Sequence, residues 1–336
     1  MQKTRLGRTG LYVSRVAVGA LPIQRADMEK ARDILLKAYE NGINFFDTAR
    51  GYSDSEEKIG YALSDVRKNI FIASKSGATG RKGFFADLHT SLKNLRTDYI
   101  DLYQLHNPSV LPDPKDPESS CSAALEAKKM GLIRHVGITN HKVENARAAI
   151  DSGIYETVQF PFSMLSSDDD KALVGECAKK DIGFIAMKAL SGGLITDAAV
   201  AFAFLWQYEN VVPIWGIQRM SELDEFLSLE KELPLMDEQM MRKIEGYRKE
   251  LSGSFCRGCG YCMPCPVGIP INMAARISLL LKRAPTENFL NPDWYSKMKL
   301  IEDCRKCGSC KNKCPYGLDV PALLEAELEK YKKEFN

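Results

Sequence analysis

The sequence lacks any long hydrophobic run. Among its 336 residues, the densest short apolar stretch covers only residues 277–281, whereas a membrane-spanning helix needs ~20 apolar residues. The first ten residues, MQKTRLGRTG, are charged and contain no apolar segment of the kind that directs secretion. We therefore expect a cytoplasmic protein without a membrane partner.

An excess of charge of either sign is also absent. The chain has 46 Lys and Arg against 44 Asp and Glu, a formal net charge of +2. Proteins that bind nucleic acid generally carry a basic excess, so no nucleic-acid partner is expected. Histidine is scarce as well, with four in the chain and none after His141.

Short β-rich runs alternate with amphipathic stretches over residues 16–229. Eight runs can be counted, at 16–19, 43–49, 70–75, 100–106, 135–140, 157–162, 183–189 and 211–217. Between them, apolar residues recur at helical spacing. Strands that are each followed by a helix pair in parallel, and eight such units in about 220 residues match the size of a (β/α)8 TIM barrel. We therefore predict this α/β fold, with functional groups at the carboxyl ends of the strands.

An open doubly wound sheet is the alternative arrangement of the same elements. Such sheets usually carry a G-x-G-x-x-G phosphate turn after the first strand. The residues that follow the first run, Gly19-Ala20-Leu21, do not fit that pattern. The sequence therefore favours the barrel.

Cysteine is unevenly distributed along the chain. Eight of the ten cysteines lie between residues 256 and 314, and the other two, Cys121 and Cys177, are predicted to be ordinary core residues. The composition changes after Leu251, which predicts a barrel over 1–251 and a second domain over 252–336. The segment CPVGIPI at 265–271 returns as CPYGLDV at 314–320, and each copy runs into an expected helix, 272–282 or 321–331. This repeat indicates a pseudo-twofold module.

The eight clustered cysteines form two groups, Cys256-x2-Cys259-x2-Cys262-x2-Cys265 and Cys304-x2-Cys307-x2-Cys310-x3-Cys314, each followed by proline. The second spacing resembles the bacterial ferredoxin run, in which three thiolates hold one 4Fe-4S cluster and the fourth reaches a second cluster. That resemblance implies a ferredoxin-like domain with two clusters, whose crossed ligand sets are Cys256, Cys259, Cys262 and Cys314, and Cys304, Cys307, Cys310 and Cys265. The x2 step before Cys265 departs from the ferredoxin spacing.

Two zinc sites are the alternative for these cysteines. Zinc sites typically use two separated C-x2-C pairs and often include histidine, which residues 252–336 lack. These residues contain 13 basic and 9 acidic side chains, a surplus that would balance the charge of about −2 on each oxidised cluster. Both observations favour iron–sulfur clusters.

Four polar residues stand at or just beyond the predicted strand ends: Asp47, Tyr52, Lys75 and His106. An ammonium beside a phenol stabilises the phenolate and lowers the tyrosine pKa, while a carboxylate keeps the ammonium charged and in place. An imidazole can orient or polarise a carbonyl group. Together these groups predict a proton-transfer site.

The same segments resemble the signature motifs of the aldo-keto reductase superfamily. The motifs are FDTARGY at 46–52, IASK at 72–75 and DLYQLH at 101–106, with LGRTG at 6–10 resembling the family's N-terminal hairpin. The resemblance implies an NAD(P)(H)-dependent oxidoreductase that interconverts a small-molecule carbonyl and an alcohol. It makes Tyr52 the general acid/base, supported by Asp47, Lys75 and His106.

The resemblance also implies a set of cofactor contacts. Thr139, Asn140 and Gln159 would meet the nicotinamide carboxamide, although such residues alone are more often turn or cap residues. The pyrophosphate and adenosine would lie against Met187, Lys188, Leu190, Gly192, Gly216, Gln218, Arg219, Glu222 and Glu225. Backbone N–H groups where a helix begins near Ser221 suit a phosphate.

One position departs from the pattern that is typical of NADP-binding relatives. Glu222 stands where many of them have an arginine for the 2′-phosphate, and Phe226 stands where they often have asparagine. A carboxylate repels a phosphate but accepts hydrogen bonds from a free 2′-hydroxyl. The sequence therefore favours NAD(H) over NADP(H), with Arg219 as an argument for the opposite choice.

The two domains predict two redox chemistries. A hydride carries two electrons together and a cluster passes one at a time, and no flavin-binding motif is identifiable that would link the two. The iron–sulfur domain would therefore either shape the barrel pocket or pass electrons to an external one-electron redox protein. The alternative is an electron-transfer or redox-sensing module whose barrel binds cofactor without turnover.

The proline-rich loop 107–118 is expected either to wall the pocket or to be a plain connection, and Trp215 and Trp294 are expected to be packing residues.

Overall fold

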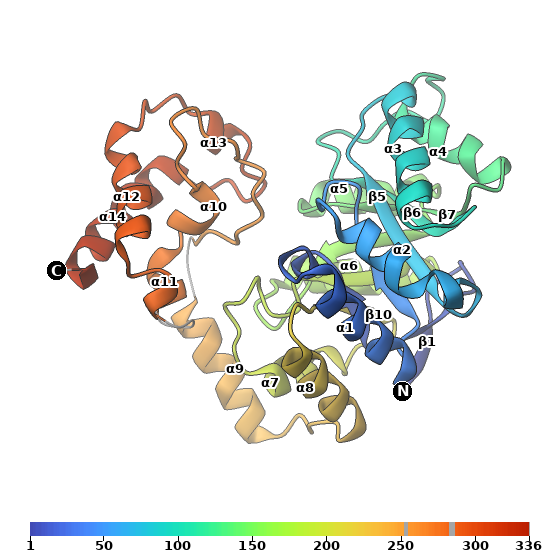
Figure 1. Cartoon of the computed structure of the whole chain (residues 1–336), viewed down its shortest axis with the longest axis horizontal. Helices are drawn as coiled ribbons and strands as arrows, with labels where there is room; N and C mark the ends of the chain where they lie inside the picture. Colours follow the sequence, from blue (N-terminus) through green and yellow to red (C-terminus); the bar gives the residue numbers. More distant parts are fainter. Residues whose placement is uncertain (252–254, 282–285, 336) are drawn as a thin grey trace. The chain divides into compact units, whose positions relative to one another are not determined.

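The computed structural model describes residues 1–251, 255–281 and 286–335. The chain forms two compact units, one of Met1–Ala189 and Ala198–Met241, the other of Leu190–Asp197 and Arg242–Asn336 (Figure 1). The expected boundary, Leu251/Ser252, adjoins residues 252–254, which lie outside the described residues. Helix α9 (Glu238–Glu250) begins in the first unit and continues in the second.

Eight parallel strands, all within residues 17–216, close into a barrel in the order β10-β3-β4-β5-β6-β7-β8-β9. They are β3 (Ala17–Gly19), β4 (Phe45–Asp47), β5 (Phe71–Ser76), β6 (Ile100–His106), β7 (Ile133–Thr139), β8 (Thr157–Pro161), β9 (Gly183–Met187) and β10 (Val211–Gly216). Each lies within two residues of its predicted ends. The TIM-barrel prediction is therefore confirmed.

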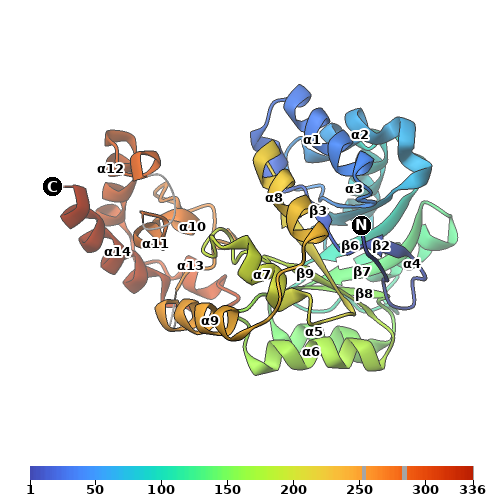
Figure 2. The same ribbon diagram turned by 90° about the horizontal axis from the view of Figure 1, so that it is seen from below.

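Helices cover the outside of the barrel, with α1 to α3 on one side and α5 and α6 on the opposite side in Figure 2. The helices of this unit are α1 (Met28–Glu40), α2 (Ser55–Leu63), α3 (Arg81–Asn94), α4 (Ser120–Lys129), α5 (Val143–Ser152), α6 (Asp168–Lys179), α7 (Ala198–Leu205) and α8 (Met220–Lys231). Their starts follow local chemistry: the Asp27 side chain accepts a hydrogen bond from Lys30 N at the start of α1, as its N-cap position predicts. Short 3-10 turns lie at Pro22–Arg25 and Ser64–Asn69.

The amino-terminal end of the barrel is closed by a hairpin. Strands β1 (Lys3–Arg5) and β2 (Tyr12–Ser14) pair antiparallel, and Gly7 bridges to Ile182, just before β9 starts. Leu6 and Val13 are buried against the inward-facing apolar residues of the barrel strands. The opposite end, where the strands finish, is therefore the end that can hold a functional site.

The second unit is helical and packs around its last helix. Its helices after α9 are α10 (Ile271–Ala274), α11 (Ile277–Leu281), α12 (Pro292–Lys299), α13 (Ser309–Asn312) and α14 (Val320–Phe335), with 3-10 turns at Thr286–Asn288 and Leu300–Asp303. The core of this unit includes Ile269, Ile277, Leu324 and Tyr331. The second repeat copy forms the continuous helix α14, as predicted.

The helix predicted over 272–282 is wrong as a single element. The chain turns between α10 and α11, where Arg276 N bonds only three residues back to Met273 O, 3.1 Å. Helix α11 starts afresh, and Glu327 of α14 accepts a hydrogen bond from Ser278 N in its first turn, 2.8 Å. Lys282 lies outside the described residues.

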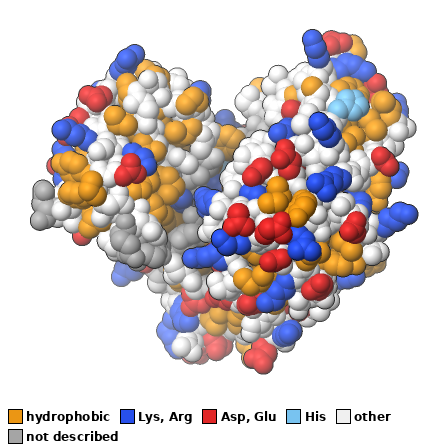
Figure 3. All heavy atoms as spheres, in the orientation of Figure 1, with side chains coloured by type: hydrophobic (Ala, Val, Ile, Leu, Met, Phe, Trp, Pro, Cys, Tyr) orange, Lys and Arg blue, Asp and Glu red, His pale blue; other side chains and the backbone are white. Residues whose placement is uncertain are grey.

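Two further properties bear on partners. Within the described residues, no helix has both the length and the apolar character needed to cross a membrane. On the face of the barrel unit seen in Figure 3, acidic and basic side chains are interspersed, as expected for a chain whose net charge is near zero.

Candidate active site and cluster-binding cysteines

Three of the four predicted catalytic side chains come from neighbouring strands. Asp47 ends β4, Lys75 is the penultimate residue of β5 and His106 ends β6. Tyr52 follows β4 in a turn where Tyr52 N bonds to Ala49 O, 3.0 Å. The parallel register therefore brings all four to the carboxyl end of the barrel, as the sequence predicts.

Asp47 and Lys75 form an ion pair that is almost completely buried. Lys75 Nζ lies 2.6 Å from Asp47 Oδ1 and also donates to Thr48 O at 2.5 Å. Burial raises the pKa of Asp47 and lowers that of Lys75, while the charge of each partner works in the opposite direction. Each charge thus depends on the other, which fixes the ammonium in one place.

Tyr52 packs beside this pair and beside His106. Its ring lies 5.8 Å from the His106 ring in an edge-on arrangement, and Lys75 Nζ lies 5.1 Å from the Tyr52 ring centroid. The predicted lowering of the Tyr52 pKa is wrong for this structure: burial, and then the Asp47 charge, raise it above its usual value. The Lys75 cation lies over the ring, and the raised pKa means that Tyr52 keeps its proton and can donate it.

His106 is an uncharged imidazole in this environment. Burial, helped by the Lys75 charge, lowers its pKa to about 3. A neutral imidazole can donate one hydrogen bond and accept another. It therefore suits the predicted role of orienting a carbonyl group.

Gln104 belongs to the same network, and the sequence analysis missed it. Its Nε2 donates to Gln159 Oε1 at 2.8 Å and lies 3.4 Å from Asp47 Oδ2. Gln104 is fully buried and stands two residues before His106, so both side chains share one face of β6. A polar residue inside the apolar run IDLYQLH, in register with His106, was the available signal.

Glu56 is a second buried group that the sequence analysis missed. This fully buried carboxylate of α2 accepts a hydrogen bond from Ser74 Oγ at 2.6 Å and pairs with Arg50 Nη1 at 2.5 Å. Arg50 N in turn bonds to Lys75 O, 3.0 Å. Glu56 thus fixes the turn that carries Tyr52 to β5.

The three residues predicted to meet the nicotinamide carboxamide are all buried. Thr139 is the last residue of β7, Asn140 follows it, and Gln159 lies in β8. Gln159 faces the catalytic pair, with its Nε2 3.5 Å from Asp47 Oδ1. Thr139 Oγ1 accepts from Asn107 N at 3.0 Å, and Asn140 Nδ2 donates to Pro108 O at 3.0 Å. In this structure, therefore, Thr139 and Asn140 also anchor the start of the loop 107–118.

The residues predicted to line the pyrophosphate follow β9. Met187 ends that strand, and Lys188 and Ser191 have left-handed backbone conformations with φ of 60° and 49°. Leu190 and Gly192, however, lie in the segment Leu190–Asp197, which belongs to the second compact unit. The residues predicted to line the pyrophosphate therefore do not all belong to the first compact unit.

The predicted phosphate site at the start of α8 holds a side chain of the protein itself. Glu222 Oε2 accepts hydrogen bonds from Gln218 N at 2.9 Å and Arg219 N at 3.1 Å. Glu222 Oε1 also pairs with Arg219 Nη2 at 2.7 Å. Gly216 ends β10 and Glu225 is exposed. The carboxylate thus takes up the two N–H groups just before the helix and neutralises the nearby arginine.

Phe226 and Trp215 are core residues. Phe202 stacks on Trp215 at 4.3 Å between ring centroids, and Trp215 lies 4.9 Å from Phe226. Trp294 packs edge-on against Phe289 at 5.4 Å. Cys121 and Cys177 are fully buried. The predictions that both tryptophans and both isolated cysteines are packing residues are confirmed.

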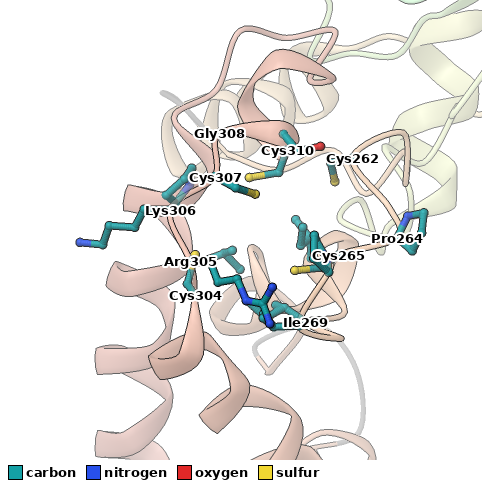
Figure 4. Close-up of a pocket in the computed structure, with 16 residues that line it drawn as sticks. Cys262, Pro264, Cys265, Ile269, Cys304, Arg305, Lys306, Cys307, Gly308 and Cys310 are labelled. Atoms are coloured by element: carbon teal, nitrogen blue, oxygen red, sulfur yellow. The ribbon is translucent and has the colours of Figure 1, made fainter.

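Five cysteines from both sequence groups line one cavity in the second unit. Cys265 lies opposite Cys304, Cys307 and Cys310, as Figure 4 shows. These four are the crossed set predicted for one cluster, and their thiols suit the ligands of a 4Fe-4S cluster. Cys262 also borders this cavity.

The remaining cysteines group around Cys256. The charges of Cys259 and Cys314 both act on the pKa of the Cys256 thiol, which burial raises, and those of Cys256 and Cys259 act on Cys262. Cys310 also acts on Cys262, which lines the cavity of Figure 4 as well, so the division of the eight cysteines into two crossed sets stays a prediction. Among the described residues, no three Cys, His, Asp or Glu side chains are arranged to hold a single metal ion.

Comparison with known proteins identifies both halves of the chain. A family model described as "Aldo/keto reductase family" matches residues 15–200. The chain belongs to the aldo/keto reductase family. It is therefore an oxidoreductase, and a model described as "4Fe-4S dicluster domain" matches residues 255–319, which favours iron–sulfur clusters over zinc.

Relatives support this aldo/keto reductase assignment. The chain is 29% identical over 211 residues to "Uncharacterized oxidoreductase YqkF" of Bacillus subtilis, covering 59% of this chain and 67% of the relative. It is 28% identical over 226 residues to the "NADH-specific methylglyoxal reductase" of Escherichia coli, covering 58% and 69%. Each match spans about two thirds of the relative's own length.

A solved structure shows the same fold. The holo form of the aldo-keto reductase AKR11C1 from Bacillus halodurans superposes with a TM-score of 0.65, covering 74% of this chain and 99% of that one at 22% identity. At this level of identity the likeness concerns the fold alone.

Proposed function

We propose that the barrel interconverts a small-molecule carbonyl and an alcohol, using Tyr52 as general acid/base. The observation that carries this proposal is the Tyr52 ring packed beside His106 and the buried Asp47–Lys75 pair. A bound nicotinamide cofactor would supply the hydride, or accept it in the reverse direction. The buried amide of Gln159 and the hydroxyl of Thr139 fit its carboxamide.

Each residue has a distinct part in the reduction. Tyr52 donates its phenolic proton to the carbonyl oxygen while the carbonyl carbon gains the hydride, so the product is an alcohol and Tyr52 recovers a proton from solvent. The Lys75 cation over the ring stabilises the transient phenolate, and Asp47 fixes Lys75. The His106 imidazole orients the carbonyl oxygen by a hydrogen bond.

Replacement of Tyr52 by phenylalanine tests this proposal. Under anaerobic conditions, with a panel of aldehydes, ketones and polyols, Tyr52→Phe should lose roughly 10²- to 10⁴-fold in kcat because the proton donor is gone. Cofactor binding, measured by fluorescence, should stay within about twofold. A Tyr52→Phe variant with full activity would disprove the mechanism.

We further propose that the cofactor is NAD(H). The carboxylate of Glu222 takes up the Gln218 and Arg219 N–H groups just before α8 and neutralises Arg219, so a 2′-phosphate would meet negative charge there. A free 2′-hydroxyl can instead donate to that carboxylate.

Fluorescence titration of both cofactors decides between them. NADH should bind the wild type more tightly, and Glu222→Gln should reduce its advantage over NADPH about tenfold by removing the charge. Asp224→Asn is the matched control because Asp224 is an exposed acid on α8 that pairs with Lys37. Wild-type protein that binds NADPH at least tenfold more tightly would overturn the choice.

The second unit is proposed to hold two 4Fe-4S clusters in the crossed sets and to exchange single electrons with an external redox protein. Cys307 is the only exposed cysteine of the eight, and it belongs to the set around the cavity of Figure 4. Electron transfer is therefore expected at the second cluster, the one held by this set.

A further inference from the structure

Arg276 lies at the break between α10 and α11, and its charged group is buried between two loops. Its side chain is only 7% exposed, and Nη1 donates to Gly192 O at 3.1 Å. On its other side it packs on Gly258: an ideal Cβ on that glycine would lie 2.6 Å from Arg276 Cζ. The guanidinium thus joins residues 190–197 to the turn between Cys256 and Cys259.

Both loops are shaped to receive this side chain. Gly192 and Gly258 have φ of +68° and +65°, a conformation that side chains other than glycine rarely adopt. A Cβ on Gly192 would meet Arg276 Nη1 at 3.2 Å and Arg257 O at 3.5 Å. The backbones of the two loops therefore lie against each other with the arginine between them.

The position of the guanidinium gives it two effects. A buried cation beside Cys256 favours the more negative, reduced state of a cluster held there. The same cation fixes a carbonyl in the loop that would cover the cofactor pyrophosphate. A change of charge in the 190–197 loop therefore alters the environment of the cluster at Cys256, and a change of charge at that cluster alters the environment of the loop.

We propose that Arg276 couples occupancy of the 190–197 loop by the cofactor to the redox state of the cluster at Cys256. The inference rests on the proposed cofactor and cluster sites. Because coupling between two binding equilibria is reciprocal, and the anionic pyrophosphate and the more negative reduced cluster depend on the same cation, the reduced cluster weakens cofactor binding by the same factor by which bound cofactor disfavours reduction.

ADP-ribose is the appropriate probe because it carries the pyrophosphate and cannot exchange a hydride. Anaerobic titrations of the reconstituted full chain should give an ADP-ribose Kd about tenfold higher for the reduced than for the oxidised protein. Saturating ADP-ribose should then lower the reduction potential of one cluster, followed by EPR, by the equivalent of about 59 mV for one electron.

Substitutions of Arg276 distinguish the coupling between the two sites from cluster assembly and from ADP-ribose binding. Arg276→Gln should abolish both shifts while iron content stays complete. Arg276→Lys, which keeps the charge but not the planar donor, should retain the cluster potential and lose ADP-ribose affinity. It also serves if Arg276→Gln fails to assemble. Arg257→Gln is the control, since it removes an exposed cation from the same turn.

Failure of the coupling and failure of the proposed cofactor site give different results. If wild-type protein binds ADP-ribose but Arg276→Gln keeps both shifts, or if wild-type protein shows neither shift, Arg276 does not couple the sites. If wild-type protein binds neither ADP-ribose nor NADH, the proposed cofactor site is wrong and the coupling fails with it.

Discussion

Buried charge is the main feature of the barrel site at the scale of single residues. Asp47, Lys75 and Glu56 are almost fully buried, and each has a partner of opposite charge within 2.6 Å. Removing one member of such a pair leaves an uncompensated charge, which costs about 3–5 kcal/mol. Substitutions of Asp47 or Lys75 will therefore lower stability as well as activity, whereas Tyr52 can be changed without breaking a charge pair.

The pH dependence of carbonyl reduction follows from the neutral state of His106 and Tyr52. Free histidine titrates near pH 6.5, but burial and the Lys75 charge lower the pKa of His106 to about 3. Burial and the Asp47 charge raise the pKa of Tyr52, so the proton donor persists at alkaline pH. Between about pH 6 and about pH 9, kcat/KM for reduction should therefore be flat.

Steady-state kinetics of the wild type and His106→Gln, with saturating cofactor, measure this profile. Both should be level, with the variant lower throughout because the hydrogen bond to the carbonyl is altered. A decrease below about pH 6.5 that is present in the wild type and absent in His106→Gln would show that His106 titrates in the working range.

The four catalytic candidates could be placed from sequence because strand ends follow from the alternation of strands and helices. The direction of the Tyr52 pKa shift could not be predicted from the sequence. It depends on the burial of the phenol and on the positions of the charges around it. Gln104 was visible only as a polar residue in an apolar strand. Its partners Asp47 and Gln159 come from other strands, 57 and 55 residues away.

Helix α8 shows how an element can be predicted correctly while its chemistry is not. The start of the helix and its available N–H groups follow from the sequence. Glu222, three residues after Arg219 in a capping box, accepts hydrogen bonds from the Gln218 and Arg219 N–H groups just before the helix. A capping carboxylate and a phosphate both favour a helix start, so the sequence pattern alone does not distinguish them.

Phe226 gives a stability test at the scale of this helix. Phe226 packs with Phe202 and Trp215 between α8, α7 and β10. Phe226→Asn, which introduces the residue often found at this position in relatives that use NADP, should destabilise the barrel by about 3–5 kcal/mol. The cofactor preference should not change, because the side chain lies in the core.

Thermal unfolding and paired NADH and NADPH titrations measure both effects. Ser228→Asn, at an exposed position two residues further along α8, is the control and should unfold as the wild type does. A stable Phe226→Asn variant that binds NADPH more tightly would place residue 226 at the cofactor instead of in the core.

The break between α10 and α11 could not be predicted from the repeat. Both copies carry an apolar helical pattern, but only the first is interrupted, at Arg276. The interruption is stabilised by distant partners, the carbonyl of Gly192 and the carboxylate of Glu327. Periodicity describes what a segment can form alone, and these partners lie 84 and 49 residues away from the groups that they bind.

In the whole molecule, the proposed function gives two electron chemistries. The proposed barrel reaction moves electrons in pairs as a hydride, and each proposed 4Fe-4S cluster moves one. In the proposed crossed ligand sets, Cys265 and Cys314 each complete the site of the other group, so the two cysteine groups would have to fold together. Loss of the cluster proposed at Cys304, Cys307, Cys310 and Cys265 need not affect the barrel chemistry, because the catalytic side chains all come from the first unit and Arg276 contacts the turn of the other cysteine group.

A double replacement of Cys304 and Cys307 by serine tests this separation. Both residues line the cavity of the second cluster, so the variant should lose that cluster. After reduction with dithionite and desalting, the wild type should deliver two electrons per chain to a one-electron dye, and the variant one. Hydride transfer with NADH should stay within about twofold of the wild-type rate.

Cys177→Ala, a buried cysteine outside both sets, should leave both measurements unchanged. If the double variant loses hydride transfer together with its fold, the clusters are structural; if it still delivers two electrons, the ligand assignment is wrong.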